Sequence, residues 1–598
     1  MVDASESPRQ IWHARLVIPV RPGALTLCYP EWIPGEHMPD GPIVNLAGLK
    51  IFAAGKPLAW RRDLVDMFAF HLEVPEGTDA IEVQLDYLLA GVSAKYSSGA
   101  SATGQLTVVS WNQVLLYPPG KPVNELTYEP SLRLPEGWQF ATALPVAKRS
   151  GSNVEFVPVA LNTLVDSPVL AGTYFRVIPL TGDEAPRHEI DMAADSEAAL
   201  AMSAEEIEHY RRLVAETGAL FGSRHYRDYH FLVSLSDDVS HFGLEHHESS
   251  DDRVAERTLL DEGLRLYEAG LLPHEFVHSW NGKYRRPADL TTPDYQQPMK
   301  DDLLWVYEGL TQYLGDILTA RSGLFTPEQL REDIAYFAAT LDYRAGREWR
   351  PLQDTADSAP FLYAAPDEWT AWRRSTDFYD EGALLWLEAD TLIRQQTRGK
   401  HSLNDFCRAF FGGPGGAPAV KTYTFDELVA ALNDVAPYHW KGFFTERLDS
   451  HAPHAPLGGI EQGGWRLTYS DEPNLSQMAS EQAHRMLDLS FSLGLVLDED
   501  GTVRDVIPGM AGAKAGLGPG MKIVAVSERQ WSVDLMREAM RGTKSSTRPL
   551  ELLVANGEYY KTYSLDYRGG IRYPHLERDS SHSDLLSEII KPLASKGK

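Results

Sequence analysis

The feature that most constrains this chain is the run Leu-Leu-Pro-His-Glu-Phe-Val-His at residues 271–278. Two histidines four residues apart lie on one face of a helix, so His274 and His278 can bind the same metal ion. Glu275 lies beside this pair, where a general base can take a proton from water that the metal activates. The alternative is an amphipathic helix with two surface histidines. We favour the metal site, because the run is otherwise apolar.

A metal site with two imidazoles needs a third protein ligand, and Glu308 is the best candidate. It is the only carboxylate in the apolar run at residues 303–313. A lone buried carboxylate is costly unless it is paired or binds a metal. The competing interpretation makes Glu308 an exposed helix residue. Zinc suits this ligand set with one position left open, so we predict one zinc ion per chain.

Length and charge limit the classes of protein to consider. The chain has 598 residues, too many for a single core, so we expect several domains. It carries 84 acidic and 56 basic residues, which argues against nucleic acid and anionic membranes as partners. No apolar run is long enough to cross a bilayer, and the two cysteines form no disulfide framework. The chain opens without a leader signal, so we expect a soluble protein that is cytoplasmic or has lost a leader.

The pattern of the sequence changes along the chain and predicts three domains and a tail. Residues 1–185 contain short strands separated by turn residues, which indicate a β-sandwich-like domain. Within it, we interpret the aromatic turn at residues 29–37 as a packing corner. Residues 186–455 are mostly helical and carry the metal motif, whereas residues 456–575 return to strands. The polar residues 576–598 are expected to form a loosely held tail, and the fold class is multidomain α+β.

Together these segments resemble the M61 family of metallopeptidases, the glycyl aminopeptidase family. The resemblance rests on His274–Asn281 with Arg285-Arg286-Pro287 just after it, on Leu304–Thr311, on Gly243–His246 and on the Trp-Ile-Pro-Gly corner. It implies a thermolysin-like zinc-peptidase domain between an N-terminal β-domain and a C-terminal PDZ domain. It also implies that His274, His278 and Glu308 bind the zinc ion.

A more distant likeness, to the M1 aminopeptidases, implies roles for two further segments. Their Gly-x-Met-Glu-Asn strand is similar to the chain around Gly243 and Glu245, so these two residues would bind the free α-amine of a substrate. Their Tyr-Glu-Lys-Gly helix start is similar to the chain at Tyr379, whose hydroxyl would donate a hydrogen bond to the tetrahedral oxyanion. The competing interpretation of Tyr379 is an ordinary amphipathic tyrosine.

Two other binding surfaces are considered. In the PDZ-like domain, the loop Leu493-Gly494-Leu495 would present a strand edge to an extended peptide or to a partner's C-terminus. A second metal site is a weaker hypothesis, because the spacing of its residues matches no common ligand pattern. Its candidate ligands are His241, His246, His247 and Glu248.

The sequence therefore predicts a zinc-dependent aminopeptidase that removes N-terminal residues from peptides. A preference for glycine or alanine follows from the resemblance alone, as does export from a bacterial cell. Two alternatives stay open: an endopeptidase that recruits chains through its PDZ-like domain, and a peptide-binding scaffold whose metal site is structural. Glu275 argues against the scaffold, because a structural zinc site needs no base. The oligomeric state stays open as well.

Overall fold

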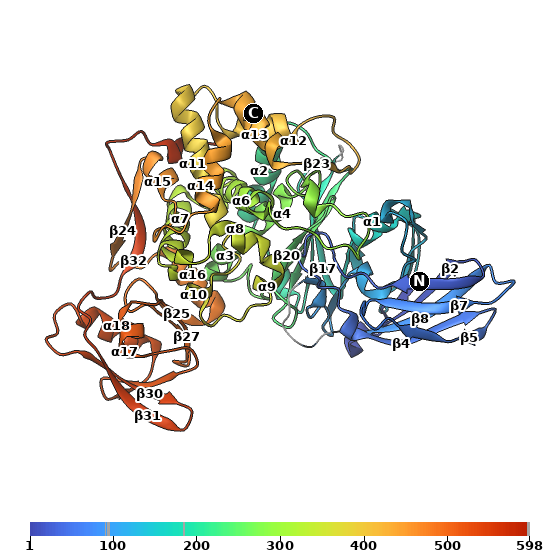
Figure 1. Cartoon of the computed structure of the whole chain (residues 1–598), viewed down its shortest axis with the longest axis horizontal. Helices are drawn as coiled ribbons and strands as arrows, with labels where there is room; N and C mark the ends of the chain where they lie inside the picture. Colours follow the sequence, from blue (N-terminus) through green and yellow to red (C-terminus); the bar gives the residue numbers. More distant parts are fainter. Residues whose placement is uncertain (90, 92–95, 183–185, 595–598) are drawn as a thin grey trace.

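The protein has three regions that follow one another along the chain. The computed structural model describes residues 1–89, 91, 96–182 and 186–594. In Figure 1 a strand-rich N-terminal region (blue) and a small C-terminal unit (red) lie on opposite sides of a mostly helical centre. The predicted multidomain architecture of mixed α and β structure is confirmed, with an N-terminal β-rich domain. Within the described residues, no helix combines the length and apolar composition that a membrane crossing requires.

The N-terminal region is built on an eight-stranded sheet and a three-stranded sheet that share one core. Strand β8 (Ala80–Leu88) lies inside the larger sheet, and every second residue is buried. This alternation puts Ile81, Val83 and Leu85 on the core face, as the period of two in a strand requires. In sheet order the larger sheet contains β13 Val146–Ser150, β14 Asn153–Phe156, β11 Ser131–Arg133, β1 Val2–Asp3, β2 Ile11–Pro19, β8, β4 Leu46–Ala53 and β5 Lys56–Leu58. The smaller sheet contains β3 Gly23–Cys28, β7 Ala69–Val74 and β6 Trp60–Arg62.

The central region begins earlier than the sequence pattern predicts. Strand β17 (Tyr174–Pro179) pairs antiparallel with β18 (His188–Ala194), so it belongs to the central sheet. The predicted boundary at residue 185 therefore falls inside this sheet, because a single strand cannot reveal from its own sequence which sheet it joins. The sheet continues with β19 Tyr229–Leu235, β21 Ser249–Val254 and the edge strand β20 Phe242–Glu245.

Helices cover this sheet and carry the functional residues. Two of them start at capping boxes: Ser203 caps α2 with Glu206, and Thr326 caps α7 with Gln329. The central helices used below are α2 Ala204–Phe221, α3 Glu262–Glu268, α4 Leu271–Val277, α5 Leu304–Tyr307, α6 Gly309–Ser322, α7 Pro327–Asp342 and α11 Asp380–Thr397. Helices α4, α6 and α11 share one apolar core with the sheet, so the elements that bear the metal motif are held from several sides.

The C-terminal unit has its own core but no free edge at the predicted peptide-binding strand. Strand β26 (Leu495–Asp498) pairs with β25 (Met486–Leu489) on one side and with β27 (Val503–Val506) on the other. Leu493 and Leu495 are fully buried, and the Gly494 N–H donates to the carbonyl of Leu489. The predicted strand addition at Leu493-Gly494-Leu495 is therefore wrong for this arrangement, because the chain's own β25 occupies that edge. The rest of the unit contains β28 Lys522–Val526, β29 Arg529–Gln530, β30 Leu550–Asn556, β31 Tyr559–Leu565, α17 Ala511–Ala515 and α18 Val533–Gly542.

The end of the chain is not the loose tail that its composition suggests. Strand β32 (Tyr573–Arg578) pairs with β24 (Trp465–Ser470), and helix α19 (Leu585–Ile589) follows it. Leu586 and Ile589 are buried in the core of the central region. The expectation for residues 576–598 fails because two apolar side chains are enough to anchor a polar segment; residues 595–598 lie outside the described part.

Candidate metal centre

Helix α4 places the two histidines of the motif on one side. Leu272, Phe276 and Val277 pack into the central core, so the opposite side of the helix turns His274 toward the cleft. His278 follows the last helical residue but keeps helical backbone angles, with φ −59° and ψ −23°. The spacing of one helical turn is therefore preserved between the two imidazoles.

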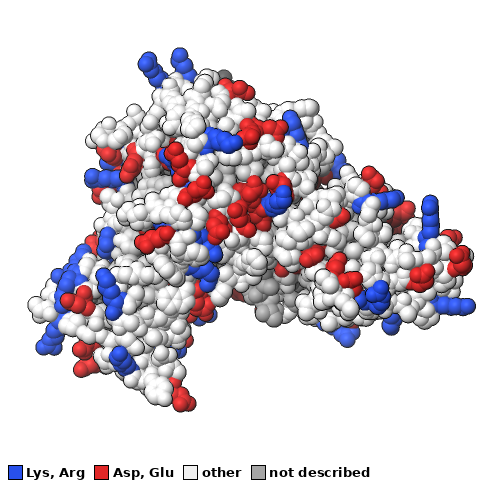
Figure 2. Space-filling model, viewed as in Figure 1, with Lys and Arg blue, Asp and Glu red and all other residues white. Residues whose placement is uncertain are grey.

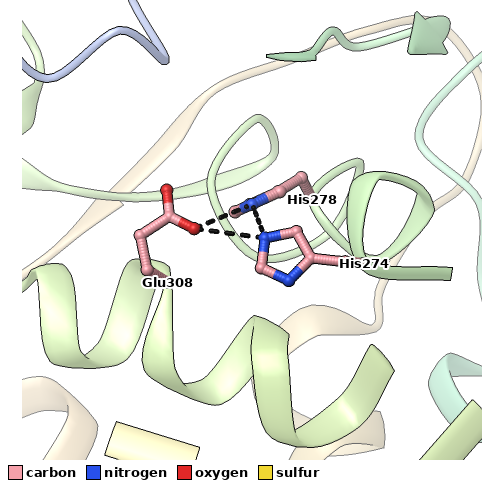
Figure 3. Close-up of side chains that lie close together, drawn as sticks. All are labelled: His274, His278 and Glu308. Carbon is pink, nitrogen blue, oxygen red and sulfur yellow. Dashed lines mark hydrogen bonds and ion pairs between the residues drawn. The ribbon is translucent and has the colours of Figure 1, made fainter. Parts of the chain in front are cut away.

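The carboxylate of Glu308, the third predicted ligand, lies next to both imidazoles. Glu308 lies at the junction of α5 and α6, and Figure 3 shows the three side chains converging from two separate helical segments. The Nε2 atoms of His274 and His278 are 3.1 Å apart. Oε2 of Glu308 lies 3.2 Å from each of them. In a tetrahedral zinc site with bonds of about 2.0–2.1 Å, ligand atoms lie about 3.3–3.4 Å apart, so this donor set fits zinc.

A backbone carbonyl sets the tautomer of one histidine. Nδ1 of His278 lies 2.8 Å from the carbonyl oxygen of Asn281. A carbonyl only accepts, so Nδ1 carries the proton and the Nε2 lone pair points to the metal position. The Asn281 side chain in turn donates to the carbonyl of Val306 at 2.8 Å. This bond ties the turn after α4 to the helix that leads into Glu308.

The aromatic turn of the N-terminal region reaches the same carboxylate. Nε2 of His37 lies 2.7 Å from Oε1 of Glu308, the oxygen that faces away from the two ligand histidines. Both side chains are almost fully buried, at 1% and 2% exposure. The interpretation of this turn as a packing corner only is therefore wrong. No local signal marks His37, because 271 residues separate it from Glu308.

Glu275 is held close to the metal ligands with part of its carboxylate unused. Its Oε2 is buried and has no hydrogen-bond partner among the described residues. Burial, with Glu245 nearby, raises the pKa of Glu275 well above its ordinary value. Gly243 lies directly behind it: a Cβ added at Gly243 would be 2.0 Å from Oε1 of Glu275. The structure thus places Gly243 against the predicted base, whereas the sequence pattern groups it with the amine-binding residue.

Glu245 lies on the edge strand β20, beside both the base and the metal ligands. One atom each from Glu245, Glu275 and His278 lies within 4.8 Å of the other two. The Tyr307 hydroxyl donates to Oε1 of Glu245, and Lys283 Nζ is 3.8 Å from the same oxygen. Burial raises the pKa of Glu245, but Lys283 together with His278 and His37 lowers it, and the pKa lies below its ordinary value overall. Glu245 is therefore ionised at neutral pH and can attract a cation.

Tyr379 belongs to a cluster of tyrosines above the metal ligands. Its hydroxyl lies 2.6 Å from the hydroxyl of Tyr363, and its ring centroid is 5.9 Å from that of His274. The ring of Tyr96 is 5.7 Å from that of Tyr363, and all three tyrosines line the cleft. Burial raises the pKa of Tyr379 well above its ordinary value, so the hydroxyl keeps its proton. Sequence analysis missed Tyr96 and Tyr363, which stand in no motif.

The hypothetical second metal site does not form. His241 contacts the carbonyl of Ser236, and Glu248 pairs with Arg227. His246 and His247 turn to Asp166, at 3.3 and 2.8 Å. The four residues therefore face three separate partners, and their side chains do not converge on one point. Elsewhere in the described chain, Glu189, Asp191 and His230 lie close enough to share an ion, but His230 already pairs with both carboxylates.

The three candidate metal ligands line a cleft of about 590 Å³. All three regions of the chain line it: Gly35 and Tyr96 from the N-terminal region, and Ser476 and Ser480 from helix α16 (Leu475–His484). No lysine or arginine lines the cleft among the described residues, whereas seven carboxylates do. Acidic side chains also gather near the middle of the outer face in Figure 2. Among the lining groups the pKa of Glu245 is lowered, so its negative charge favours a cationic group on the ligand.

Comparison with known proteins relates two parts of the chain to one family. The family described as M61 glycyl aminopeptidase matches residues 267–385, and the peptidase M61 N-terminal domain matches residues 1–173. No curated protein matches the chain.

Among solved structures, an aminopeptidase N family protein from Idiomarina loihiensis has 17% identity and a TM-score of 0.80, over 100% of this chain and 99% of its own. An M1 zinc metallopeptidase from Deinococcus radiodurans has 16% identity and a TM-score of 0.44, over 75% of this chain and 91% of its own. The first of these likenesses establishes the overall fold, and its identity is too low to carry the activity.

Proposed function

We propose that this chain, which belongs to the M61 glycyl aminopeptidase family and is a metallo-aminopeptidase, binds a single zinc ion through His274, His278 and Glu308. The proposed reaction is hydrolysis of the first peptide bond of a peptide with a free, small N-terminal residue. Two imidazoles and one carboxylate form the donor set of many catalytic zinc sites. The spacing of 3.1–3.2 Å between these donor atoms supports the same ion.

One observation carries the proposal: a base and an amine-binding carboxylate border the same metal ligand. Atoms of Glu245, Glu275 and His278 lie within 4.8 Å of one another. A structural metal site has no use for the unpartnered carboxylate of Glu275, and an endopeptidase has no use for a fixed carboxylate beside it. An aminopeptidase needs both, because the α-amine of its substrate is a cation that must lie next to the reacting bond.

Each residue has a distinct task in the proposed mechanism. Zinc, when bound by these three residues, would supply the Lewis acidity that the attack of water on the scissile carbonyl needs. Glu275 takes the proton of the attacking water and passes it to the leaving amine. Glu245 binds the α-ammonium group, so the first peptide bond is the one presented to Glu275. Tyr379, with its hydroxyl bonded to Tyr363, donates to the oxyanion that forms at the carbonyl oxygen.

The C-terminal part of the chain contributes to the wall of the cleft, which the sequence pattern did not indicate. Helix α16 lies against α3 and α7, with Gln482 Nε2 2.8 Å from Asp261. The Tyr336 hydroxyl on α7 donates to Asp488 at 2.9 Å. Ser476 and Ser480 on α16 form part of the cleft wall. We infer that this wall limits the length of peptide that can lie beyond the metal.

The test is hydrolysis of glycyl- and alanyl-p-nitroanilide beside their N-acetylated forms, with and without a chelator. We expect cleavage of the free-amine substrates alone, loss of cleavage on chelation, and recovery with zinc. Glu245→Gln is expected to raise KM for the free-amine substrates at least about tenfold, because it removes the charge partner of the amine. Equal hydrolysis of acetylated substrates by the wild-type protein would instead establish an endopeptidase.

A further inference from the structure

Glu308 uses its two carboxylate oxygens for two different partners. Oε2 faces the two ligand histidines, at 3.2 Å from each Nε2. Oε1 faces the imidazole of His37, at 2.7 Å. A carboxylate that binds a metal through one oxygen is oriented by the hydrogen bond at its other oxygen. His37 therefore decides which lone pairs of Glu308 point to the metal position.

The surroundings of His37 hold its ring in one place. The ring stacks on Tyr363 at 6.2 Å between centroids and meets the edge of Tyr307 at 5.0 Å. Its backbone has a φ of +53°, in the left-handed region that few non-glycine residues adopt. Such backbone strain persists where the surrounding structure imposes it, and it is concentrated at functional sites. His37 is thus fixed by packing before any metal binds.

The turn that carries His37 is also fastened to the central region. Lys283, which is fully buried, donates to the carbonyl of Pro34 at 3.3 Å and to Asp166 at 3.1 Å. Glu31 and Trp32 donate their N–H groups to the carbonyl of Tyr295, at 3.1 and 2.8 Å. The N-terminal region is therefore docked where it can act on Glu308.

We propose that His37 is a positioning residue for the metal site, donating from Nε2 to Oε1 of Glu308 so that the N-terminal domain completes the metal centre. The inference rests on the proposed function, because it concerns the affinity for zinc. Neither the histidine motif nor the helix that bears Glu308 supplies this bond. The N-terminal domain thereby contributes a residue to the active site.

The test compares two amides at position 37. The glutamine side chain of His37→Gln carries its amide nitrogen at the same distance along the chain as Nε2 of histidine, so it can still donate to Glu308. The asparagine side chain of His37→Asn is one bond shorter, so its amide nitrogen does not extend that far. Asparagine adopts left-handed backbone more readily than glutamine, so a purely structural role predicts that His37→Asn is the milder change. A positioning role predicts the reverse order. His71→Ala is the matched control, since its Nε2 pairs with Asp63 at 2.9 Å in the same domain, away from the metal.

The measurement is the dissociation constant for Zn²⁺, from competition with a chromophoric chelator, with the melting temperature of each apo-protein as a check on folding. We expect zinc binding about 10–100-fold weaker in His37→Asn, near wild type in His37→Gln, and unchanged in His71→Ala. Wild-type affinity in His37→Asn, or an equal loss in both amide variants, overturns the inference. Failure of the wild-type protein itself to bind zinc would instead overturn the proposed function.

Discussion

At the scale of single residues, the site depends on one missing side chain. Gly243 on β20 leaves the space that the Glu275 carboxylate fills, since a Cβ there would lie 2.0 Å from Oε1. A methyl group at position 243 would therefore have to displace the carboxylate of Glu275, which is itself buried. The position of the base is thus set by a neighbour on another element.

We therefore predict that Gly243→Ala displaces Glu275 and lowers kcat at least about tenfold, because a general base contributes about 10²–10⁴-fold when correctly placed. Zinc content should stay at the wild-type level. Gly270→Ala is the matched control, since Gly270 lines the same cleft and a Cβ there meets nothing within 4 Å. Steady-state kinetics with metal analysis checks both variants, and equal kinetics for the two would contradict the steric argument.

The role of Glu275 itself is tested by Glu275→Gln, which keeps the shape of the side chain and removes its basicity. We expect kcat to fall by about 10²–10⁴-fold, while KM changes little. Zinc binding should persist, since Glu275 is not part of the group formed by His274, His278 and Glu308. A variant with full activity and bound zinc would refute the mechanism.

At the scale of elements, the start of helix α11 is held by buried ion pairs. Arg374 Nε lies 2.6 Å from Asp377, and Arg347 Nη2 lies 2.8 Å from Glu381. Arg374 also pairs with Glu381. Tyr379 stands between these two carboxylates in the chain, so the network fixes the residue that is proposed to stabilise the oxyanion.

Arg374→Ala removes one of the two arginines that pair with each buried carboxylate, while Arg344 stays with Asp377 and Arg347 with Glu381. We expect a loss of at most about 3–5 kcal/mol in the free energy of unfolding. Urea denaturation measures it. Arg373→Ala is the control, because the hydrogen bonds of Arg373 go to backbone carbonyls, that of Glu368 at 3.0 Å and that of Pro366. If both variants unfold at the same urea concentration as wild type, the network does not hold the helix.

At the scale of the whole molecule, distant parts of the chain return to the central region. The turn at His37 comes from the N-terminal region, α16 lines the cleft, and α19 contacts α6. Arg321 on α6 donates to the carbonyl of Ile589 at 3.0 Å. Glu216 on α2 accepts from the backbone N–H of Leu593 at 2.7 Å. The C-terminal segment therefore contacts α2 and also α6, the helix that begins next to the candidate ligand Glu308.

Ile589→Ala should destabilise the protein by about 2–5 kcal/mol, the usual cost of removing a fully buried branched side chain. Lys591→Ala, two residues later and exposed, should cost at most about 1 kcal/mol. Chemical denaturation distinguishes the two. A loose tail would make both substitutions neutral, so the comparison tests the packing of α19 directly.

Much of the site could be predicted because its signals are local. The spacing of His274 and His278 decides their common face, and the apolar setting of Glu308 explains why its carboxylate must find a partner. Glu245 and Tyr379 come from motif likeness, and the structure places both at the cleft. The sequence did not predict which sheet β17 joins or that α19 packs on the central core. Both elements are short, and their positions depend on the elements that they contact.

The sequence by itself determined the two-histidine helix, the neighbouring Glu275, the single carboxylate in an apolar run and the acidic character of the chain. Each of these follows from periodicity or composition within a few turns of chain. Only the tertiary structure decided that His37 lies within hydrogen-bond distance of Glu308, that Gly243 contacts Glu275 and that β25 pairs with β26. These contacts join residues whose separation in sequence carries no pattern, since they arise when apolar faces pack and bring buried polar groups within hydrogen-bond distance.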